Sequence, residues 1–268
     1  MADYRNVDTK QRSQADKPHR QSVAQMTAAA IVGDITGHLD PKLLGRLQDA
    51  MLAHSPHEGR AAVRQAVMSG VRAEDIADFY VPKLARIFGE MWCDDELSFG
   101  EVTIAVSRLQ TALRDLEAFW PCADRAGPRG VAMATLMLVV PQDVFHTLGA
   151  FVLSGQLRRK GISVKMVLGG TGRAVTDELS RSAFGAIFIS ASQSDSLESL
   201  RRIIDAVQAA TEDAPPIVIG GNILDVVSAE TVMAETGANY ATGNAEEALR
   251  HCGLLLTTQE LAPNIHGG

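Results

Sequence analysis

The chain has 268 residues, of which 46% are hydrophobic and 21% charged, and its formal net charge is -7. These values predict a globular protein of one or two domains and exclude collagen, a disordered chain and a small disulfide-stapled protein. The negative charge argues against a protein that coats nucleic acid through bulk electrostatics. Because the apolar runs are too short for a bilayer helix and the N-terminus is too polar for a signal peptide, we expect a cytoplasmic protein without membrane contact.

Residues 1–25 contain basic and acidic side chains but almost nothing that a hydrophobic core could bury. Such a segment cannot offset the conformational entropy that it would lose on ordering, so we predict a disordered arm. We also predict that residues 258–268 form a flexible tail.

Residues 26–121 show helical periodicity and few breakers. Three helices are predicted over residues 41–54, 58–69 and 73–89, because each segment places its apolar side chains on one face. Pro82 is expected to kink the third helix.

A fourth helix has the clearest signals in this region. Ser98 and Glu101 have the spacing of a capping box, and apolar residues then recur at alternating steps of four and three up to Trp120. Such a seam is typical of a helix that packs against others, so residues 26–121 are predicted to form a four-helix bundle.

A cluster of proline, glycine and polar residues at 121–128 marks a domain boundary. In the following domain, 129–257, strands are predicted at 131–140, 163–168, 186–190, 216–220 and 238–241, and helices at 146–160, 174–182, 196–211, 226–236 and 245–256. This alternation predicts an α/β domain with a flavodoxin-like, doubly wound parallel sheet. Ligands of such sheets bind beyond the carboxyl ends of the strands.

Three of the loops at those strand ends carry distinctive residues. His146 follows the first strand and precedes Thr147, Leu148 and Gly149; Ser190 and Ser192 follow the third strand; and Gly220 and Gly221 follow the fourth. Residues 150–189 separate the first group from the second, and residues 193–219 separate the second from the third. A single histidine at a strand-to-helix junction is usually only a polar residue near a helix start, but here the order and the separations agree.

This set resembles the cobalamin-binding fingerprint, in which Asp-x-His-x-x-Gly, Ser-x-Leu and Gly-Gly follow one another at similar separations. The resemblance implies that His146 replaces the dimethylbenzimidazole base as the lower ligand of cobalt. It also implies that Ser190, Gly220 and Gly221 line the slot for the released nucleotide tail, with Thr147, Leu148, Gly149 and Ser192 as further cofactor contacts. The residue types suit this role, because neutral imidazole binds transition metals well and glycine lets the backbone approach a bulky ligand.

The chain departs from the fingerprint at two positions. Val144 stands where the family has the aspartate that orients the imidazole, so we expect weaker or switchable cobalt ligation. Ser192 stands where the family has leucine, which changes the packing of the tail slot.

The loop after the second strand has a different partial motif. Gly170 and Gly172 supply two glycines of the dinucleotide pattern G-x-G-x-x-G, but Val175 occupies the place of the third. We interpret this loop as a flexible turn rather than a nucleotide site. Cys93, Cys122 and Cys252 have no metal-site or redox-motif spacing and are interpreted as ordinary thiols.

The helical region extends the resemblance. Trp92 is retained from cobalamin photoreceptor regulators, whereas Val102 and Thr103 replace the Glu-His pair that follows nine residues later in those proteins. Taken alone, Trp92 is more often a plain core residue. Beside a cobalamin domain, the resemblance implies that it caps the upper face of the corrin.

The longer segment 92–110 resembles the AerR/PpaA regulators of purple-bacterial photosynthesis genes and a related sensor domain proposed to hold heme. The AerR/PpaA resemblance implies a non-enzymatic, light-responsive antirepressor that binds adenosyl- or hydroxocobalamin and antagonises a CrtJ/PpsR-type repressor. A corrinoid methyl carrier that serves a separate methyltransferase and a heme-binding redox sensor are the alternatives. Direct contact with DNA is unsupported, because the chain is acidic and has no convincing helix-turn-helix.

Overall fold

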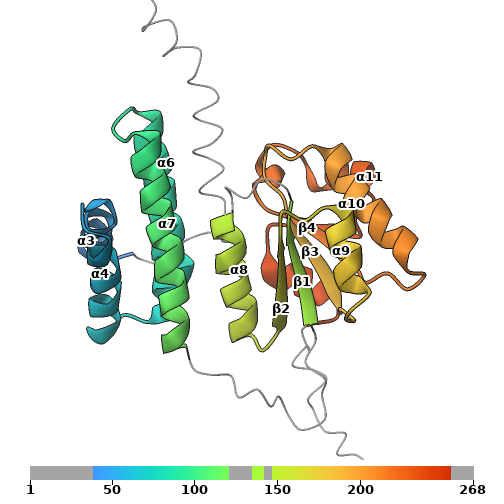
Figure 1. The fold of residues 1–268 in the computed structure, drawn as a ribbon, viewed down its shortest axis with the longest axis horizontal. Coiled ribbons are helices and arrows are strands. Elements are labelled where there is room, and N and C mark those ends of the chain that lie inside the picture. Colours follow the sequence, from blue (N-terminus) through green and yellow to red (C-terminus); the bar gives the residue numbers. More distant parts are fainter. Residues whose placement is uncertain (1–38, 121–134, 142–146, 255–268) are drawn as a thin grey trace, which may run out of the picture. The chain divides into compact units, whose positions relative to one another are not determined.

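The computed structural model of the protein describes residues 39–120, 135–141 and 147–254. The predictions for the arm 1–25, the boundary 121–128 and the tail 258–268 lie outside these residues. The described residues divide into two compact units (Figure 1). A helical unit contains residues 39–120 and 147–156, and a sheet unit contains residues 135–141 and 157–254.

The first two helices of the helical unit are α3 (Pro41–Leu52) and α4 (Pro56–Met68). Each begins with a proline, which has no backbone N–H to leave unpaired at a helix start. The side chains of Asp40 and Ser55 cap them by accepting hydrogen bonds from the backbone N–H groups of Lys42 and His57. The cap at Ser55 places the start of α4 two residues before its predicted position.

The third helix is one continuous segment made of α5 (Ala73–Asp75), η1 (Ile76–Tyr80) and α6 (Val81–Cys93). The η1 segment is π-helical and lies just before Pro82, where we expected a kink. Proline cannot donate a hydrogen bond to the preceding turn, and wide π turns are a known way to accommodate such a break. In this turn the N–H of Val81 donates to the carbonyl of Ile76, five residues earlier.

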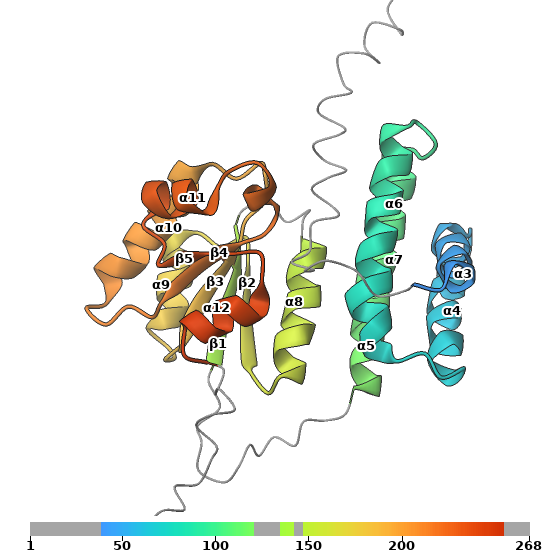
Figure 2. The same ribbon diagram turned by 180° about the vertical axis from the view of Figure 1, so that it is seen from behind.

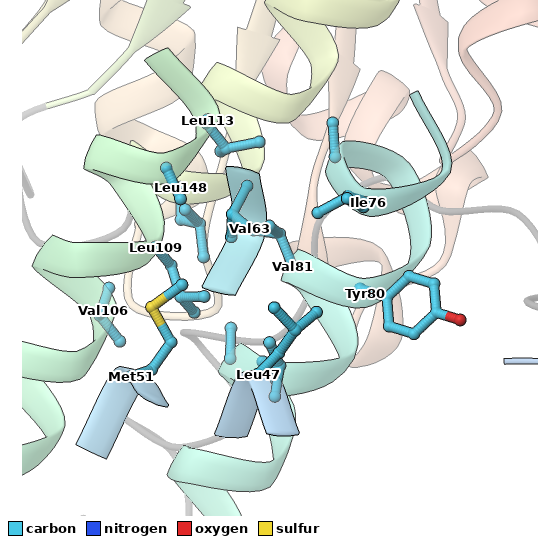
Figure 3. Packing of buried hydrophobic residues seen from close by; sticks show 14 of the residues in the cluster. Leu47, Met51, Val63, Ile76, Tyr80, Val81, Val106, Leu109, Leu113 and Leu148 are labelled. Atoms are coloured by element: carbon cyan, nitrogen blue, oxygen red, sulfur yellow. The ribbon is translucent and has the colours of Figure 1, made fainter. Parts of the chain in front are cut away.

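The fourth helix is α7 (Phe99–Leu116), followed by the short 3₁₀ segment η2 (Glu117–Phe119). Its predicted capping box is confirmed: Ser98 Oγ accepts from the N–H of Glu101, and the Glu101 carboxylate accepts from the N–H of Ser98. The predicted seam is buried from Val102 to Leu116, and Trp120 at its end is partly buried. Figure 3 shows Val106, Leu109 and Leu113 of this seam in the core.

A fifth helix, α8 (Thr147–Arg159), completes the helical unit. The sequence assigned it to the sheet domain as the helix after the first strand, whereas the structure groups its residues up to Gln156 with the bundle. The reason is apolar packing, because Leu148 and Val152 belong to the same buried core as Leu109 and Leu113. Figure 3 shows Leu148 beside Leu109 and Leu113.

The sheet unit contains a five-stranded sheet in which every neighbouring pair of strands is parallel (Figure 2). The strands are β1 (Thr135–Val140), β2 (Ser163–Leu168), β3 (Ala186–Ser190), β4 (Ile217–Gly220) and β5 (Tyr240–Ala241). Their order, β2-β1-β3-β4-β5, confirms the predicted flavodoxin-like, doubly wound sheet.

Helices α9 (Gly172–Leu179), α10 (Leu197–Ala210) and α11 (Ala229–Thr236) share one buried core with one face of this sheet. Alternate strand residues form that face, among them Met137, Val139, Ile187, Ile189, Ile217 and Ile219. Because side chains alternate along a strand, Ser190 belongs to the opposite face, together with Phe188. The remaining segments are the 3₁₀ turn η4 (Asn222–Asp225) and helix α12 (Ala245–His251).

Side-chain caps explain why α9 and α11 begin at other residues than predicted. Ser228 accepts from the N–H of Thr231, so α11 begins three residues after its predicted start at 226. Thr171 accepts from the N–H of Ala174, so α9 begins two residues before its predicted start. Across the ranges that the structure describes, none of the helices combines the length and apolar character needed to cross a bilayer.

Candidate functional site

The carboxyl ends of β1, β3 and β4 lie at one edge of the sheet because these strands are parallel neighbours. In the β2-β1-β3-β4-β5 order, the connections run in opposite directions on the two sides of β1, so the crevice between the ends of β1 and β3 is the expected ligand position. Ser190 and Gly220 are register partners at the ends of β3 and β4. The structure therefore brings these two predicted site residues together, whereas His146 lies outside the described residues.

Gly221 has a backbone conformation that only glycine adopts readily, with φ of 102° and ψ of -177°. A Cβ atom at this position would lie 2.2 Å from the carbonyl oxygen of Ala191. The two loops are further joined where the N–H of Ala191 donates to the carbonyl of Gly220 at 2.8 Å. Glycine is therefore required here by the contact between the loops.

Ser192, which replaces the leucine of the fingerprint, is 6% exposed and fully engaged within its own turn. Its N–H and its hydroxyl donate to Oδ2 of Asp195 at 2.7 and 3.0 Å, and its Oγ lies 2.8 Å from Oγ of Ser194. A buried hydroxyl needs such partners because an unpaired one is costly. A direct contact between Ser192 and a cofactor remains a prediction.

Asn222 is a buried polar residue at this edge that the sequence interpretation did not single out. Its side chain is buried, and its Oδ1 accepts a hydrogen bond from the N–H of Gln193 at 3.2 Å. This bond fastens the turn after β4 to the loop after β3. Its position directly after the glycine pair could have indicated this contact from the sequence, because a polar side chain in such a turn can reach neighbouring backbone groups.

A pocket of about 570 Å³ lies near the same edge of the sheet, among the starts of α9 and α10. Its lining residues are Pro141, Gly170, Thr171, Gly172, Ser194, Asp195, Ser196, Ser199, Arg202 and Ile203. The two glycines of the partial dinucleotide motif have packing explanations. A Cβ atom on Gly170 would lie 2.4 Å from Val139 Cγ1, and one on Gly172 would lie 2.8 Å from the Cβ of Ala206.

The residues after His146 belong to the first turns of α8. Thr147 is 4% exposed, and its Oγ1 accepts a hydrogen bond from Nε2 of Gln110 at 2.9 Å. Leu148 lies in the core of the helical unit, so its side chain is engaged in packing. Gly149 is partly buried in the same turn. Cofactor contacts of these three residues remain predictions.

Trp92 lies near the end of α6 and is 8% exposed, as part of the core of the helical unit. Its ring centroid is 5.9 Å from that of Phe99, with a tilt of 56° between the rings. Phe99 itself is 61% exposed, and Ile104 on the same helix is also exposed. The sequence interpretation singled out Trp92 and missed Phe99, although an aromatic residue at the first position of a capped helix was a usable signal.

No group of three or more histidine, cysteine, aspartate or glutamate side chains could hold a metal ion within the described ranges. A cobalt ion that a corrin ring already holds needs only an axial ligand from the protein, so this finding is compatible with the predicted cofactor. Burial raises the pKa of the Cys252 thiol to about 11, which favours its protonated form.

Two comparisons of the sequence agree with this geometry. Residues 134–252 match the B12 binding domain, a range that covers the whole sheet. The chain is also 33% identical over 174 residues to a 20.5 kDa protein encoded in the bchF-crtJ intergenic region of Rhodobacter capsulatus. That match covers 65% of this chain and 88% of the relative. The chain belongs to the AerR/PpaA type of B12-binding-domain protein.

The fold of this AerR/PpaA-type protein is similar to that of solved structures. The monomethylamine corrinoid protein of Methanosarcina barkeri is 18% identical, with a TM-score of 0.63 over 81% of this chain and 99% of that chain. A cobalamin-binding protein from Desulfitobacterium hafniense DCB-2 is also 18% identical, over 80% of this chain and 98% of that chain, but its TM-score of 0.41 is too low to support an argument. The family match supports cobalamin binding and gives no support for heme.

Proposed function

We propose that this AerR/PpaA-type protein is a light-responsive, cobalamin-binding antirepressor that acts on a CrtJ/PpsR-type repressor of photosynthesis genes. The observation that carries the proposal is the B12 binding domain in a chain whose 33% identical relative is encoded next to crtJ. We further propose that the protein performs no catalysis of its own and acts in the cytoplasm.

The edge of the sheet suits a cobalamin molecule. Ser190 offers a polar side chain beside Gly220, and Gly221 itself adds no side-chain atoms where the two loops meet. The buried hydrogen bonds of Ser192 and Asn222 hold this edge rigid before any ligand arrives, which lowers the entropy that binding would cost.

His146 is the proposed lower ligand, and chain order places it directly before the first residue of α8. Bound cobalamin would supply a cobalt ion whose axial ligands can change on illumination. Because Val144 replaces the orienting aspartate, we propose that His146 binds cobalt weakly and that another ligand can replace it easily. An exchangeable ligand gives two states of the protein, and a partner that binds one of them better can distinguish light from dark.

The test uses the full chain loaded in the dark with hydroxocobalamin or adenosylcobalamin and then separated from free cofactor. We expect retained corrinoid absorbance that changes on illumination, and a loss of retention in His146→Ala. We also expect that one illumination state of the loaded protein releases a CrtJ/PpsR-type repressor from its operator DNA in a mobility-shift assay. A repressor whose DNA binding is the same with either state would rule out antirepression.

The corrinoid methyl carrier remains the alternative, and the same preparation tests it. Protein loaded with methylcobalamin is mixed with corrinoid-dependent methyltransferases and a thiol acceptor, and the methylated thiol is measured. Our proposal expects no transfer above that of free methylcobalamin. Direct DNA binding would appear in the mobility-shift assay as a complex formed without the repressor.

A further inference from the structure

A row of four residues crosses the carboxyl ends of β2, β1, β3 and β4. Leu168 is the register partner of Val140, and Ser190 is that of Gly220. The residues just before Val140 and Ser190 are also register partners, so these two residues are aligned as well. Because neighbouring strands are about 4.8 Å apart, the row extends over about 14 Å. Four strand ends therefore contribute to one continuous surface.

The side chains of this row lie on the face of the sheet opposite to α9, α10 and α11. Their strand neighbours Val139 and Val167 belong to the core that those helices share with the sheet, and successive side chains along a strand point to opposite faces. Along the row the residues become smaller, from leucine and valine to serine and glycine. The row therefore has a large apolar end on β2 and β1 and a small polar end on β3 and β4.

Leu168, at the apolar end, is 45% exposed, whereas Val140 beside it is 3% exposed. Among the described residues of the sheet unit, Leu168 and Val226 are the large apolar side chains that are exposed. A single exposed leucine needs no ligand to explain it. This leucine, however, continues a row that ends at Ser190 and Gly220, two residues that the sequence assigned to a cofactor site.

The loop after β2 leaves the Leu168 side chain uncovered because it turns to the other face of the sheet. Gly169 has a φ of 67°, which glycine adopts readily, and the N–H of Gly170 donates to the carbonyl of Val140 at 2.8 Å. A Cβ atom on Gly170 would overlap Val139 Cγ1, which belongs to the face of α9, α10 and α11. The loop therefore fixes the end of β2 while the leucine side chain stays exposed on the opposite face.

We propose that Leu168 contacts the corrin ring of cobalamin and thereby sets the direction in which the cofactor lies on the edge of the sheet. The nucleotide tail carries a phosphate and a sugar, so it belongs at the polar end of the row, beside Ser190. The corrin ring has apolar faces and is wider than one strand spacing, so it extends across β1 to Leu168. Covering this leucine removes apolar surface from water and favours binding. The inference rests on the proposed function, because it requires bound cobalamin.

Cobinamide separates the two ends of the row experimentally, because it has the corrin ring of cobalamin but lacks the nucleotide. Equilibrium dialysis of the full chain against hydroxocobalamin or aquocobinamide measures the two affinities. We expect Leu168→Ala to weaken the binding of both corrinoids about fivefold, because both lose the same contact with the ring. Ser190→Ala should weaken the binding of cobalamin more than that of cobinamide.

Leu179→Ala is the matched control. Leu179 is a partly buried leucine at the end of α9, where the chain returns to the amino end of β3, so it lies away from the row. Its variant should bind both corrinoids within about twofold of the wild type, and so should Leu168→Met, which keeps an apolar side chain of similar size. Circular dichroism shows whether each variant is folded.

Wild-type affinity of Leu168→Ala for both corrinoids would overturn the proposal and leave cobalamin binding intact. A loss confined to cobalamin would also overturn it, because Leu168 would then contact the nucleotide. An equal loss in Leu179→Ala would show a general effect on the fold and would count against the contact. If Leu168→Ala fails to fold, Leu168→Gln, which keeps the length of the side chain but adds a polar amide, should show the same loss. A wild type that binds neither corrinoid would refute the proposed function itself.

Discussion

Gly221 approaches Ala191 so closely that a single added carbon would overlap the backbone, because a Cβ atom on Gly221 would lie 2.2 Å from the Ala191 carbonyl oxygen. This contact joins the loops after β3 and β4 at the edge where Ser190 and Gly220 end their strands. The glycine pair therefore has a structural role that does not depend on a ligand.

Gly221→Ala is the first prediction. The substitution forces a side chain into a glycine-only conformation and against backbone atoms, so we expect the free energy of unfolding to fall by about 3 kcal/mol or more. Cobalamin retention should fall as well, because the added side chain forces the loops after β3 and β4 apart. Urea unfolding followed by circular dichroism measures the stability.

Gly243→Ala is the matched control in the same unit. A Cβ atom at Gly243 meets nothing within 4 Å, so its effect should stay within about 0.5 kcal/mol. Equal losses in the two variants would show that the contact with Ala191 is unimportant.

The second prediction separates the two aromatic residues at the junction of α6 and α7. Trp92 is buried in the core, so Trp92→Ala should cost about 3–5 kcal/mol of unfolding free energy. Phe99 is largely exposed, so Phe99→Ala should cost less than about 1 kcal/mol. Thermal unfolding of both variants provides the measurement.

Cobalamin affinity gives the second half of this comparison. If the exposed aromatic ring covers part of the corrin, Phe99→Ala should weaken cobalamin binding about fivefold, equivalent to roughly 1 kcal/mol. Met68→Ala, which removes another exposed apolar side chain of the helical unit, is the control. Equal affinities for Phe99→Ala and wild type would remove Phe99 from the binding surface.

The sheet could be predicted from the sequence because its strands are short apolar runs separated by amphipathic helices. The predicted bounds of β2 and β3 agree with the structure, and the strand order is that of the predicted flavodoxin-like sheet. The capping box of α7 was equally predictable, because it depends on two residues three positions apart.

The position of α8 was not predictable from periodicity. Its apolar residues suit either a sheet or a bundle, and only the tertiary contacts of Leu148 and Val152 show that its first turns belong to the helical unit. Local patterns also omit long-range polar partners. The Gln110–Thr147 and Gln193–Asn222 bonds each join residues that are far apart in the chain.

The third prediction concerns Arg108, which closes the end of α3. Its guanidinium donates to the carbonyls of Met51 and Ala53, and at 3.4 Å to that of His54. These bonds satisfy carbonyls that have no partner within the helix. We expect Arg108→Ala to lower the free energy of unfolding by about 2 kcal/mol, because charged hydrogen bonds to partly buried groups contribute that much.

Arg60 provides the contrast. Its guanidinium forms a two-pronged ion pair with Asp115, but the Arg60 side chain is exposed and that of Asp115 is partly exposed to solvent. Arg60→Ala should therefore lower the free energy of unfolding by less than Arg108→Ala does, and by still less at high salt. Urea titrations at low and high salt distinguish the two arginines, and a larger loss for Arg60 would contradict the argument.

The last prediction concerns the pH dependence of the α7 capping box. The Ser98 hydroxyl, followed by the Ser98 backbone N–H, donates to the Glu101 carboxylate and lowers the pKa of Glu101. Because the pKa is lower in the folded state than in the unfolded state, the unfolded chain binds more protons in acid. The stabilisation that the Ser98–Glu101 hydrogen bonds provide is therefore fully present above the pKa of Glu101 in the unfolded chain. It is lost as the pH falls through the pKa of Glu101 in the folded protein.

Ser98→Ala should lower the free energy of unfolding by about 1 kcal/mol at neutral pH. The difference between wild type and Ser98→Ala should shrink as the pH falls through the folded pKa of Glu101, below which the carboxylate is protonated in both the folded and the unfolded state. Glu101→Gln should lose the same pH-dependent part, because a neutral amide replaces the carboxylate. Ser107→Ala, an exposed substitution in the middle of α7, should not destabilise the helix and serves as the control. A difference between wild type and Ser98→Ala that stays constant from neutral to acidic pH would show that the Glu101 carboxylate does not contribute to the cap.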